Sequence, residues 1–120
     1  MSDCVSWWVE LAIKPGRLES FRQLTRAMVD FTRNEPGVLC YQRFVSDDDA
    51  VVHGYEQYVD SDAALAHLRN FRERFSQSFL TMVDRRRFTV YGTPNAELKG
   101  VLDSLGAVYL KRFGDLDYWP

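Results

Sequence analysis

Hydrophobic residues alternate with other residues over the first segment of the chain, from Val5 to Ile13, so that every second side chain is apolar. Successive side chains of a β-strand point to opposite faces, and this period of two therefore predicts a strand with one buried face. Trp8 makes the second face partly apolar as well. The pair Pro15–Gly16 then favours a turn, which ends the strand.

The apolar positions that follow recur every three or four residues, which predicts an amphipathic helix. The segment Asn34–Gly37 ends this helix, because proline cannot continue it and glycine permits a sharp turn. Alternation returns in Val38–Val45, where Leu39 and Tyr41 are predicted to share one face, and again in Ala50–Val59. A run of polar residues separates these two segments, so they are predicted to form a hairpin.

Helical spacing begins again after Ser61, the expected N-cap, and continues to Val83, a length that allows two helices with a bend between them. A fourth strand is predicted over Arg87–Tyr91, and the three arginines Arg85, Arg86 and Arg87 are interpreted as a solvated entry to it. Asn95 is predicted to cap a short helix. The segment Ala107–Leu110 is predicted to form a last short strand or an extended arm.

The order of these elements predicts an α+β protein with the ferredoxin-like βαββαβ plan, in which both helices cover one face of an antiparallel sheet. We expect one domain over residues 1–120, with a core over about 5–92 and a C-terminal helix and strand appendage over about 93–120. The uncovered sheet face would carry tryptophan, tyrosine and phenylalanine, and exposing so much apolar surface is costly. Packing two such sheets across a two-fold axis hides it, which predicts a homodimer.

The composition is that of a globular protein, with 46% hydrophobic and 27% charged residues. No apolar run approaches the roughly 18 residues that a membrane-spanning helix needs, so no membrane partner is expected. The net charge of −2 disfavours a nucleic-acid partner, because phosphate binding needs a basic surface. The N-terminal segment Met1–Cys4 lacks the basic start of a secretory signal, and a cytoplasmic location is expected.

Three segments of the chain match the motifs of one known family. The segment Glu35–Tyr41 (EPGVLCY) resembles the E-P-G-x-L-x-Y turn and strand of the antibiotic biosynthesis monooxygenase family. Tyr55–Tyr58 (YEQY) with Ala63–His67 (AALAH) resembles its signature Y-E-x-[WY] followed by A-L-x-x-H. Arg87–Gly92 is similar to the closing strand of many members. The resemblance covers residues 5 to 92 and implies a dimeric α+β barrel.

The chemistry of this family varies among its members. Some oxidise quinols or polyketide phenols without metal or flavin, related proteins degrade haem, and many have no known activity. The sequence has Asn70–Arg72 where many members have a second histidine, and Gln77 where the haem-degrading relatives have an axial histidine. Haem is therefore not expected. Two histidines without a cysteine pair also disfavour zinc, so no metal and no cofactor are expected.

Oxygenation without a cofactor needs a dry pocket, a base that removes a proton from an electron-rich phenol, and donors that hold the resulting anion. His67 is the candidate base, because histidine exchanges a proton near neutral pH. The alternative is a structural histidine that bonds a neighbouring carbonyl. Glu56 is the second candidate catalytic residue, and it either orients His67 or pairs with an arginine.

Five further residues are candidates for binding a small apolar aromatic ligand in a pocket between the sheet and the helices near the histidine. Tyr41 and Tyr58 donate to a ligand oxygen or are core or interface tyrosines. Trp8 and Phe71 wall the pocket or are ordinary core residues. Arg43 holds an anion or forms an ion pair at the dimer interface.

The leading hypothesis for function is a cofactor-independent monooxygenase that oxidises a quinol or polycyclic phenol with O2. A second hypothesis is a non-catalytic, ligand-binding or stress-related dimer on the same fold. A third is an isomerase or lyase, as among the muconolactone-isomerase relatives. A fold alone cannot choose among them, because one fold carries many functions.

Overall fold

Strands and helices follow one another in the order that the hydrophobic pattern predicts. The computed structural model describes residues 3–118. The first two and the last two residues of the chain lie outside the described part. The elements are β1 (Val5–Ile13), α1 (Leu18–Thr32), β2 (Val38–Val45), β3 (Val51–Tyr58), α2 (Ser61–Arg74), α3 (Ser76–Met82), β4 (Val83–Tyr91), α4 (Ala96–Ser104) and β5 (Val108–Leu110).

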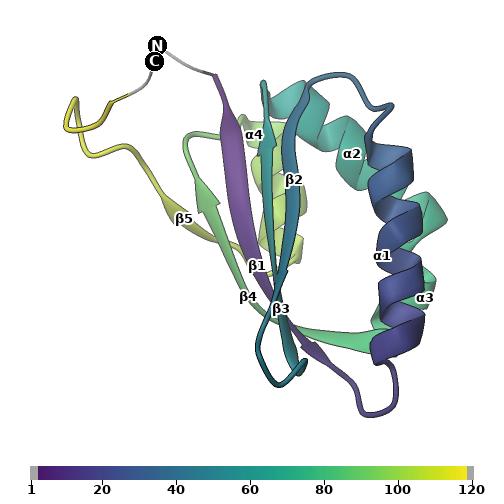
Figure 1. Cartoon of the computed structure of the whole chain (residues 1–120). Helices are drawn as coiled ribbons and strands as arrows, with labels where there is room; N and C mark the ends of the chain where they lie inside the picture. The colour runs from purple at the N-terminus through teal and green to yellow at the C-terminus, as the bar shows by residue number, and fades with distance from the viewer. Residues whose placement is uncertain (1–2, 119–120) are drawn as a thin grey trace.

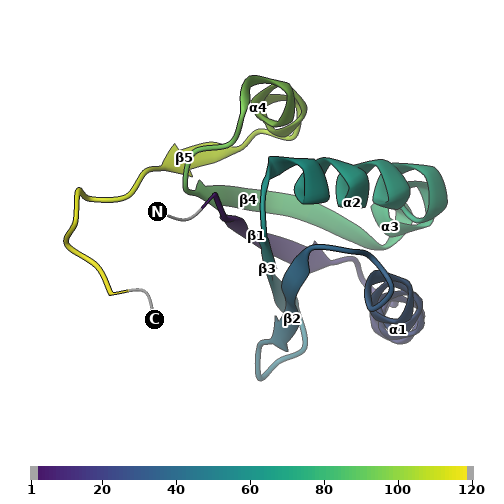
Figure 2. The same cartoon turned by 90° about the horizontal axis from the view of Figure 1, so that it is seen from above.

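The strands form one sheet in the order β2-β3-β1-β4-β5 (Figure 1). The pairs among β1 to β4 are antiparallel, and this part has the strand order of the ferredoxin-like fold, as predicted. The short β5 pairs in parallel with β4, and α4 provides the crossover between them. The helices lie on one face of the sheet, and Figure 2 shows α2 between α4 and α1. We call the covered face the inner face and the opposite one the outer face.

The hydrophobic core lies between the inner face and the helices. Every second residue of β1 is buried, which confirms the alternation read from the sequence. The buried side chains of the core come from β1, β3, β4 and the helices, and partly buried residues of β2 pack against them. The buried set includes Trp7, Val9, Leu11, Phe21, Met28, Val52, Tyr58, Ala64, Phe79, Phe88, Val90, Leu98 and Leu102. The appendage thus contributes to the core through α4.

Several predicted boundaries differ from the structure. The long helical segment divides at Phe75 into α2 and α3, as its length suggested. The N-cap of α2 is Asp60, whose carboxylate accepts from the Ala63 N–H at 2.9 Å, so the prediction of Ser61 was wrong. Asn95 does cap α4 by accepting from the Leu98 N–H at 2.9 Å. The strand β4 begins at Val83, before the predicted start at Arg87, so the three arginines that were interpreted as its solvated entry lie within the strand.

Two β-bulges change which side chains face the helices. At the start of β2, the pairing with β3 shifts between Val38 and Cys40. Val38 therefore packs against the core, and Leu39 is 53% exposed, which reverses the predicted assignment of Leu39 to the same face as Tyr41. A second shift occurs in the pairing of β1 with β4. A bulge inserts one residue into a strand, and the residues beyond it change face.

The turn before β2 brings the end of α1 close to the start of α2. Gly37 has a φ of +82°, in the region that favours glycine, and a Cβ at this position would lie 2.7 Å from the Cβ of Ala63. Its carbonyl accepts from the Val59 N–H at 2.8 Å, which ties the turn to the end of β3. Gly37 thus lets Glu35, two residues earlier, lie against α2.

We predict that Gly37→Ala destabilises the protein more than Gly16→Ala. Gly16 has a similar φ of +76°, but open space surrounds the position of its Cβ, so its substitution adds only backbone strain, about 1 kcal/mol or slightly more. Gly37→Ala adds the overlap with Ala63 and is expected to cost at least about 2 kcal/mol. Urea unfolding of the two variants measures the difference. Equal costs would show that the contact with Ala63 relaxes freely.

Candidate functional site

A cavity of about 480 Å³ lies between the inner face of the sheet and the helices α2, α3 and α4, next to His67. Its floor is formed by alternate residues of β1, namely Trp7, Val9 and Leu11, with Phe88 of β4 beside them. Apolar side chains from the helices close most of the rest, among them Leu65, Leu68, Phe71, Phe79, Val101 and Leu105. A pocket of this size and lining accommodates a small, mainly apolar molecule.

His67 lies at one end of this cavity between two carboxylates. Its Nδ1 atom is 2.7 Å from Oε1 of Glu35, and its Nε2 atom is 3.4 Å from Oε1 of Glu56. The second oxygen of Glu35 accepts from the side-chain amide of Asn70, one turn along α2 from the histidine, at 2.8 Å. Glu35 is therefore held at both oxygens, and it fixes the orientation of the imidazole ring.

The carboxylate of Glu56 is buried and accepts hydrogen bonds from three other side chains. The indole N–H of Trp7 donates to Oε1 at 3.0 Å, and the hydroxyl of Tyr58 donates to the same oxygen at 2.6 Å. The Arg43 guanidinium donates to Oε2 at 2.7 Å. Burying a charged carboxylate is costly unless it is paired and hydrogen-bonded, and both conditions are met here.

The electrostatic surroundings keep both glutamates ionised. Burial by itself raises the pKa of Glu56, but the Arg43 guanidinium and the His67 ring outweigh burial, and the pKa lies below its ordinary value of 4.5. Burial also opposes ionisation of Glu35, and hydrogen bonds from His67 and Asn70 lower the pKa of Glu35 overall. The histidine therefore has an anionic hydrogen-bond partner at Nδ1, whereas the Glu56 carboxylate lies 3.4 Å from Nε2 and makes no hydrogen bond with it.

Two tyrosines flank the histidine, with ring centroids 5.4 Å (Tyr41) and 5.3 Å (Tyr58) from the centroid of His67. Burial raises the pKa of both phenols well above the ordinary value of 10.0, and the nearby Glu56 carboxylate raises it further. Both side chains therefore stay protonated and act as hydrogen-bond donors. Tyr41 lines the cavity, whereas Tyr58 is fully buried and its hydroxyl is engaged with Glu56.

Arg43 forms its ion pair within the chain, with Glu56, so the prediction of a pair across a dimer interface does not describe it. Its guanidinium carbon lies 3.6 Å from the centre of the Tyr41 ring, an arrangement typical of a cation–π contact. The neighbouring position in β3 is Gly54, where a Cβ would lie 3.1 Å from Nη1 of Arg43. The absence of a side chain at Gly54 makes room for the guanidinium.

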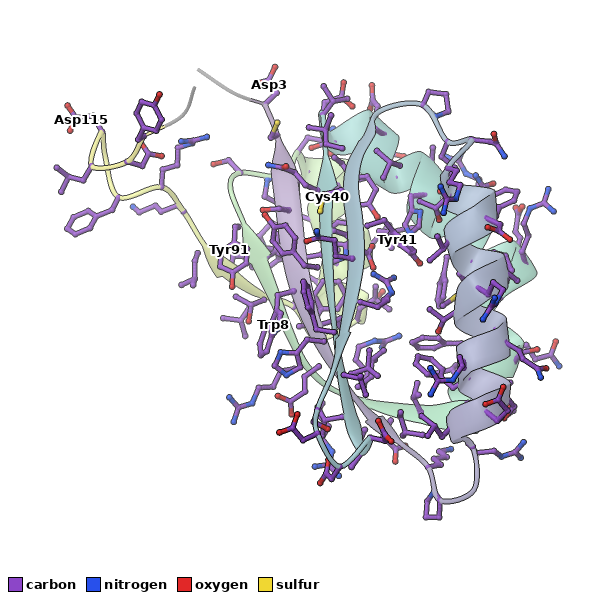
Figure 3. All side chains as sticks on the ribbon, in the orientation of Figure 1. Asp3, Trp8, Cys40, Tyr41, Tyr91 and Asp115 are labelled. Atoms are coloured by element: carbon purple, nitrogen blue, oxygen red, sulfur yellow. The ribbon has the colours of Figure 1, made fainter. Side chains whose placement is uncertain are left out.

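The structure brings together five of the seven candidate residues at the cavity, namely His67, Glu56, Tyr41, Arg43 and Phe71. Tyr58 lies behind the Glu56 carboxylate rather than at the wall, so it is not a direct ligand donor. Trp8 projects from the outer face, opposite to Tyr41, and does not line this cavity (Figure 3). Its indole N–H donates to Nδ1 of His53 at 2.8 Å.

Three residues of the site are absent from the predicted set. Glu35 was placed in a helix-ending turn and in the E-P-G motif without a role at the site, and Trp7 was only one of the alternating apolar residues of the first strand. Asn70 was noted only because the segment Asn70–Arg72 stands where many members of the antibiotic biosynthesis monooxygenase family have a second histidine. The signal that could have identified Glu35 is its place in the E-P-G motif, beside the turn that leads into β2.

The described residues contain neither a candidate metal site nor a candidate membrane-spanning helix. No group of three or more histidine, cysteine, aspartate or glutamate side chains in residues 3–118 has an arrangement that could hold a metal ion. No helix in the same range is long and apolar enough to cross a membrane.

The fold and the site define an α+β protein with a buried, carboxylate-flanked histidine at the end of an apolar cavity. The model of the antibiotic biosynthesis monooxygenase family matches residues 7–84. The chain therefore belongs to this family, as the motifs in its sequence suggested. A search among curated proteins found no significant match.

Several solved structures have the same fold as this chain. The structure of MupZ from Pseudomonas fluorescens is similar over 98% of this chain and 91% of its own, with a TM-score of 0.86 and 23% sequence identity. SnoaB from Streptomyces nogalater, described as a cofactor-independent oxygenase, has a TM-score of 0.66 at 14% identity over 79% of this chain and 97% of its own. A conserved protein from Methanosarcina mazei has a TM-score of 0.66 at 18% identity over 73% and 90%. At such identities the similarity shows the fold alone.

We predict that Glu56→Gln lowers the free energy of unfolding by about 3 kcal/mol or more at pH 7, because it leaves the Arg43 guanidinium buried without a counter-charge. Glu10→Gln is the matched control, since Glu10 lies on the same sheet's outer face and its carboxylate is 3.4 Å from Nε2 of His53. The control is expected to cost less than about 1 kcal/mol. Denaturant unfolding measures both values.

The pH dependence of the stability of Glu56→Gln tests whether the pKa of Glu56 is lowered in the folded protein. The folded-state pKa of Glu56 is lower than 4.5, so its stabilising contribution is fully present above pH 4.5 and is lost as the pH falls through the folded-state value. The stability difference between the wild type and Glu56→Gln should therefore shrink only below about pH 4.5. A difference that instead grows as the acid range is entered would contradict the pKa direction.

Proposed function

We propose that this chain is a cofactor-independent enzyme that oxidises a quinol or polycyclic phenol with O2, and that His67 transfers the proton. The observation that supports this most strongly is the position of His67, at the wall of an apolar cavity and in contact with Glu35. A catalytic histidine needs a partner that fixes one ring nitrogen, so that the other can act on the substrate.

In this proposal Nε2 of His67 accepts the phenolic proton, and Glu35 at Nδ1 stabilises the imidazolium that results. The hydroxyl of Tyr41, which stays protonated, donates to the oxygen of the substrate anion. The anion passes one electron to O2, and the radical pair combines at a ring carbon to form a peroxide. His67 returns its proton to this peroxide, and loss of water together with the hydrogen of that carbon leaves a quinone, so that one oxygen atom of O2 ends in the product and the other in water.

A second candidate follows from the charges around His67. Glu35 and Glu56 are both anionic and lie on either side of the ring, so a protonated His67 can donate as a general acid as well as accept as a base. An acid and base at one position suits an isomerase or lyase that moves a proton without oxygen. The requirement for O2 distinguishes this reaction from oxygenation.

We predict that His67→Ala lowers the rate of oxygen uptake on a hydroquinone or polycyclic phenol at least tenfold, because the proton acceptor is lost. His53→Ala is the matched control, since His53 lies on the outer face with Trp8 and should leave the rate unchanged. An oxygen electrode measures the rates, and circular dichroism verifies that both variants fold.

The outcomes of this experiment separate the hypotheses. Unchanged uptake in His67→Ala would exclude His67 as the base. Turnover under nitrogen that depends on His67 would favour the isomerase or lyase, and tight ligand binding without turnover in either gas would favour a binding protein. Glu35→Gln tests the positioning residue, and the proposal requires it to change the pH profile of the rate as well as its size.

We also propose that the chain forms a homodimer in the cytoplasm through the outer face of its sheet. In residues 3–118 no helix covers this face, and it carries exposed apolar side chains on β2, β4 and β5, including Phe44, Tyr91, Val108 and Leu110. The chain after β5 projects away from the sheet on the side opposite the helices (Figure 1), and Phe113 in this segment is 83% exposed. A second copy packed face to face would cover these side chains.

We predict that light scattering gives twice the mass of one chain, and that the double variant Phe44→Asp/Val108→Asp gives the mass of one chain. Both substitutions place a charge on the outer face, which would have to be buried in the dimer. Ala27→Asp, at an exposed position of α1, is the control and should remain dimeric. A wild type that is monomeric at micromolar concentration would contradict the proposal.

A further inference from the structure

Arg85 lies at the wall of the same cavity without a counter-charge. Its side chain is partly buried, and the cavity that contacts it also contacts His67. Among residues 3–118 no carboxylate lies within ion-pair distance of its guanidinium, and no hydrogen-bond acceptor within the chain engages it. Its neighbour Asp84 is paired with Lys14, at 4.0 Å.

The sheet is locally distorted at this position. Leu11 of β1 pairs with Arg85, whereas Glu10 pairs with Arg87, so Arg86 is the extra residue of a β-bulge in β4. Phe88 and Val90 face the helices, and regular alternation would therefore have turned Arg86 inward. The bulge turns Arg85 inward instead, on the same face as Leu11. Bulges are frequent beside functional sites, where they redirect a side chain.

The position of Arg85 is unfavourable for the protein alone. Burial lowers the pKa of the Arg85 guanidinium, and no neighbouring anion of the described residues compensates for the loss of hydration. Arg43, the other arginine of the cavity wall that is partly buried, has Glu56 as its partner, and its pKa is raised overall despite burial. A cation that is kept in a partly desolvated position without a partner indicates that a ligand provides the anion.

The cation and the histidine lie at opposite ends of the cavity floor. Along β1, Trp7 pairs with Glu56 and contacts it, whereas Leu11 pairs with Arg85. The two positions are four residues apart, which corresponds to roughly 13 Å of strand. Trp7, Val9 and Leu11 provide an apolar floor over the whole of this length. A ligand that reaches both ends is therefore elongated and apolar between its two functional groups.

We infer that Arg85 binds a carboxylate of the substrate, and that the apolar body of the substrate lies along the β1 floor with its reacting group at His67. A carboxylate fits because one planar guanidinium can donate two parallel hydrogen bonds to it. A phosphate dianion carries two charges and would need a second buried cation. The further arginines of the cavity wall, Arg69 and Arg72, are exposed on α2, so phosphate is matched less well. The inference deepens the proposed function by naming a substrate class, and it rests on that function only for the reacting group.

The test compares binding of 8-phenyloctanoate with binding of its neutral primary amide. Trp7 lines the cavity, so tryptophan fluorescence reports occupancy, and calorimetry gives the dissociation constants. The wild type is expected to bind the acid at least about tenfold more tightly than the amide, because a charge-assisted hydrogen-bond pair is formed only with the acid. Arg85→Gln should abolish this preference and leave binding of the amide nearly unchanged.

Arg86→Gln is the matched control, because Arg86 is the exposed neighbour in the bulge, and it should keep the preference for the acid. His67→Ala should also keep it, so a failure of the proposed chemistry is distinguishable from a failure of this inference. The unliganded Arg85→Gln protein is expected to melt at the same temperature as the wild type or higher, since an unpaired, partly buried charge is removed.

Three results would overturn the inference. The first is equal affinity of the wild type for the acid and the amide, or no binding of either at millimolar concentration. The second is a preference for the acid that survives in Arg85→Gln. The third is a large fall in the melting temperature of Arg85→Gln without ligand, which would mean that the guanidinium stabilises the fold rather than a ligand.

Discussion

The buried carboxylate of Glu56 is the group on which the arrangement of the site depends. It needs several donors in order to remain ionised inside the protein, and these come from three strands: Trp7 from β1, Arg43 from β2, and Tyr58 from β3 itself. Each donor reaches the carboxylate only when the strands pair in the observed register, in which Trp7 and Tyr41 both lie opposite Glu56. A shift by one residue would turn the carboxylate to the outer face and leave Arg43 unpaired. The same interactions that satisfy the charge therefore also specify the pairing of the strands.

A second constraint comes from the turn that contains Gly37. The close approach of this glycine to Ala63 lets the end of α1 lie against α2, and this contact brings Glu35 to the ring nitrogen of His67 that Glu56 does not reach. The histidine is thereby held by one carboxylate from the sheet and another from a turn. Because these two parts of the chain are connected to α2 independently, the orientation of the ring does not depend on a single neighbour.

The sequence predicts the elements of the fold better than the contacts within the site. Alternation defines β1 and β2 to the residue, because one face of each is buried or partly buried. The same alternation places Trp8 on the face opposite to Trp7, so its assignment to the pocket wall went against the pattern itself. Leu39 was assigned to the wrong face, and Arg85 was interpreted as solvated although it lines the cavity. In both strands a bulge interrupts the period of two without changing the composition of the strand. Glu35 was missed for another reason: its partner is 32 positions away, and a motif at a turn does not reveal which helix packs against it.

The charges of the cavity fall into two groups with different consequences. Glu35, His67, Glu56 and Arg43 form a connected set in which each member has a partner within the chain, and such a set keeps its geometry whether or not a ligand is present. Arg85 has no such partner within residues 3–118 and lies at the other end of an apolar floor. A charge that the fold already satisfies has little left to gain from a ligand, whereas an unsatisfied one gains the full interaction. Orientation of a reacting group and recognition of a substrate thus require opposite electrostatic surroundings, and the length of β1 separates the two within one cavity.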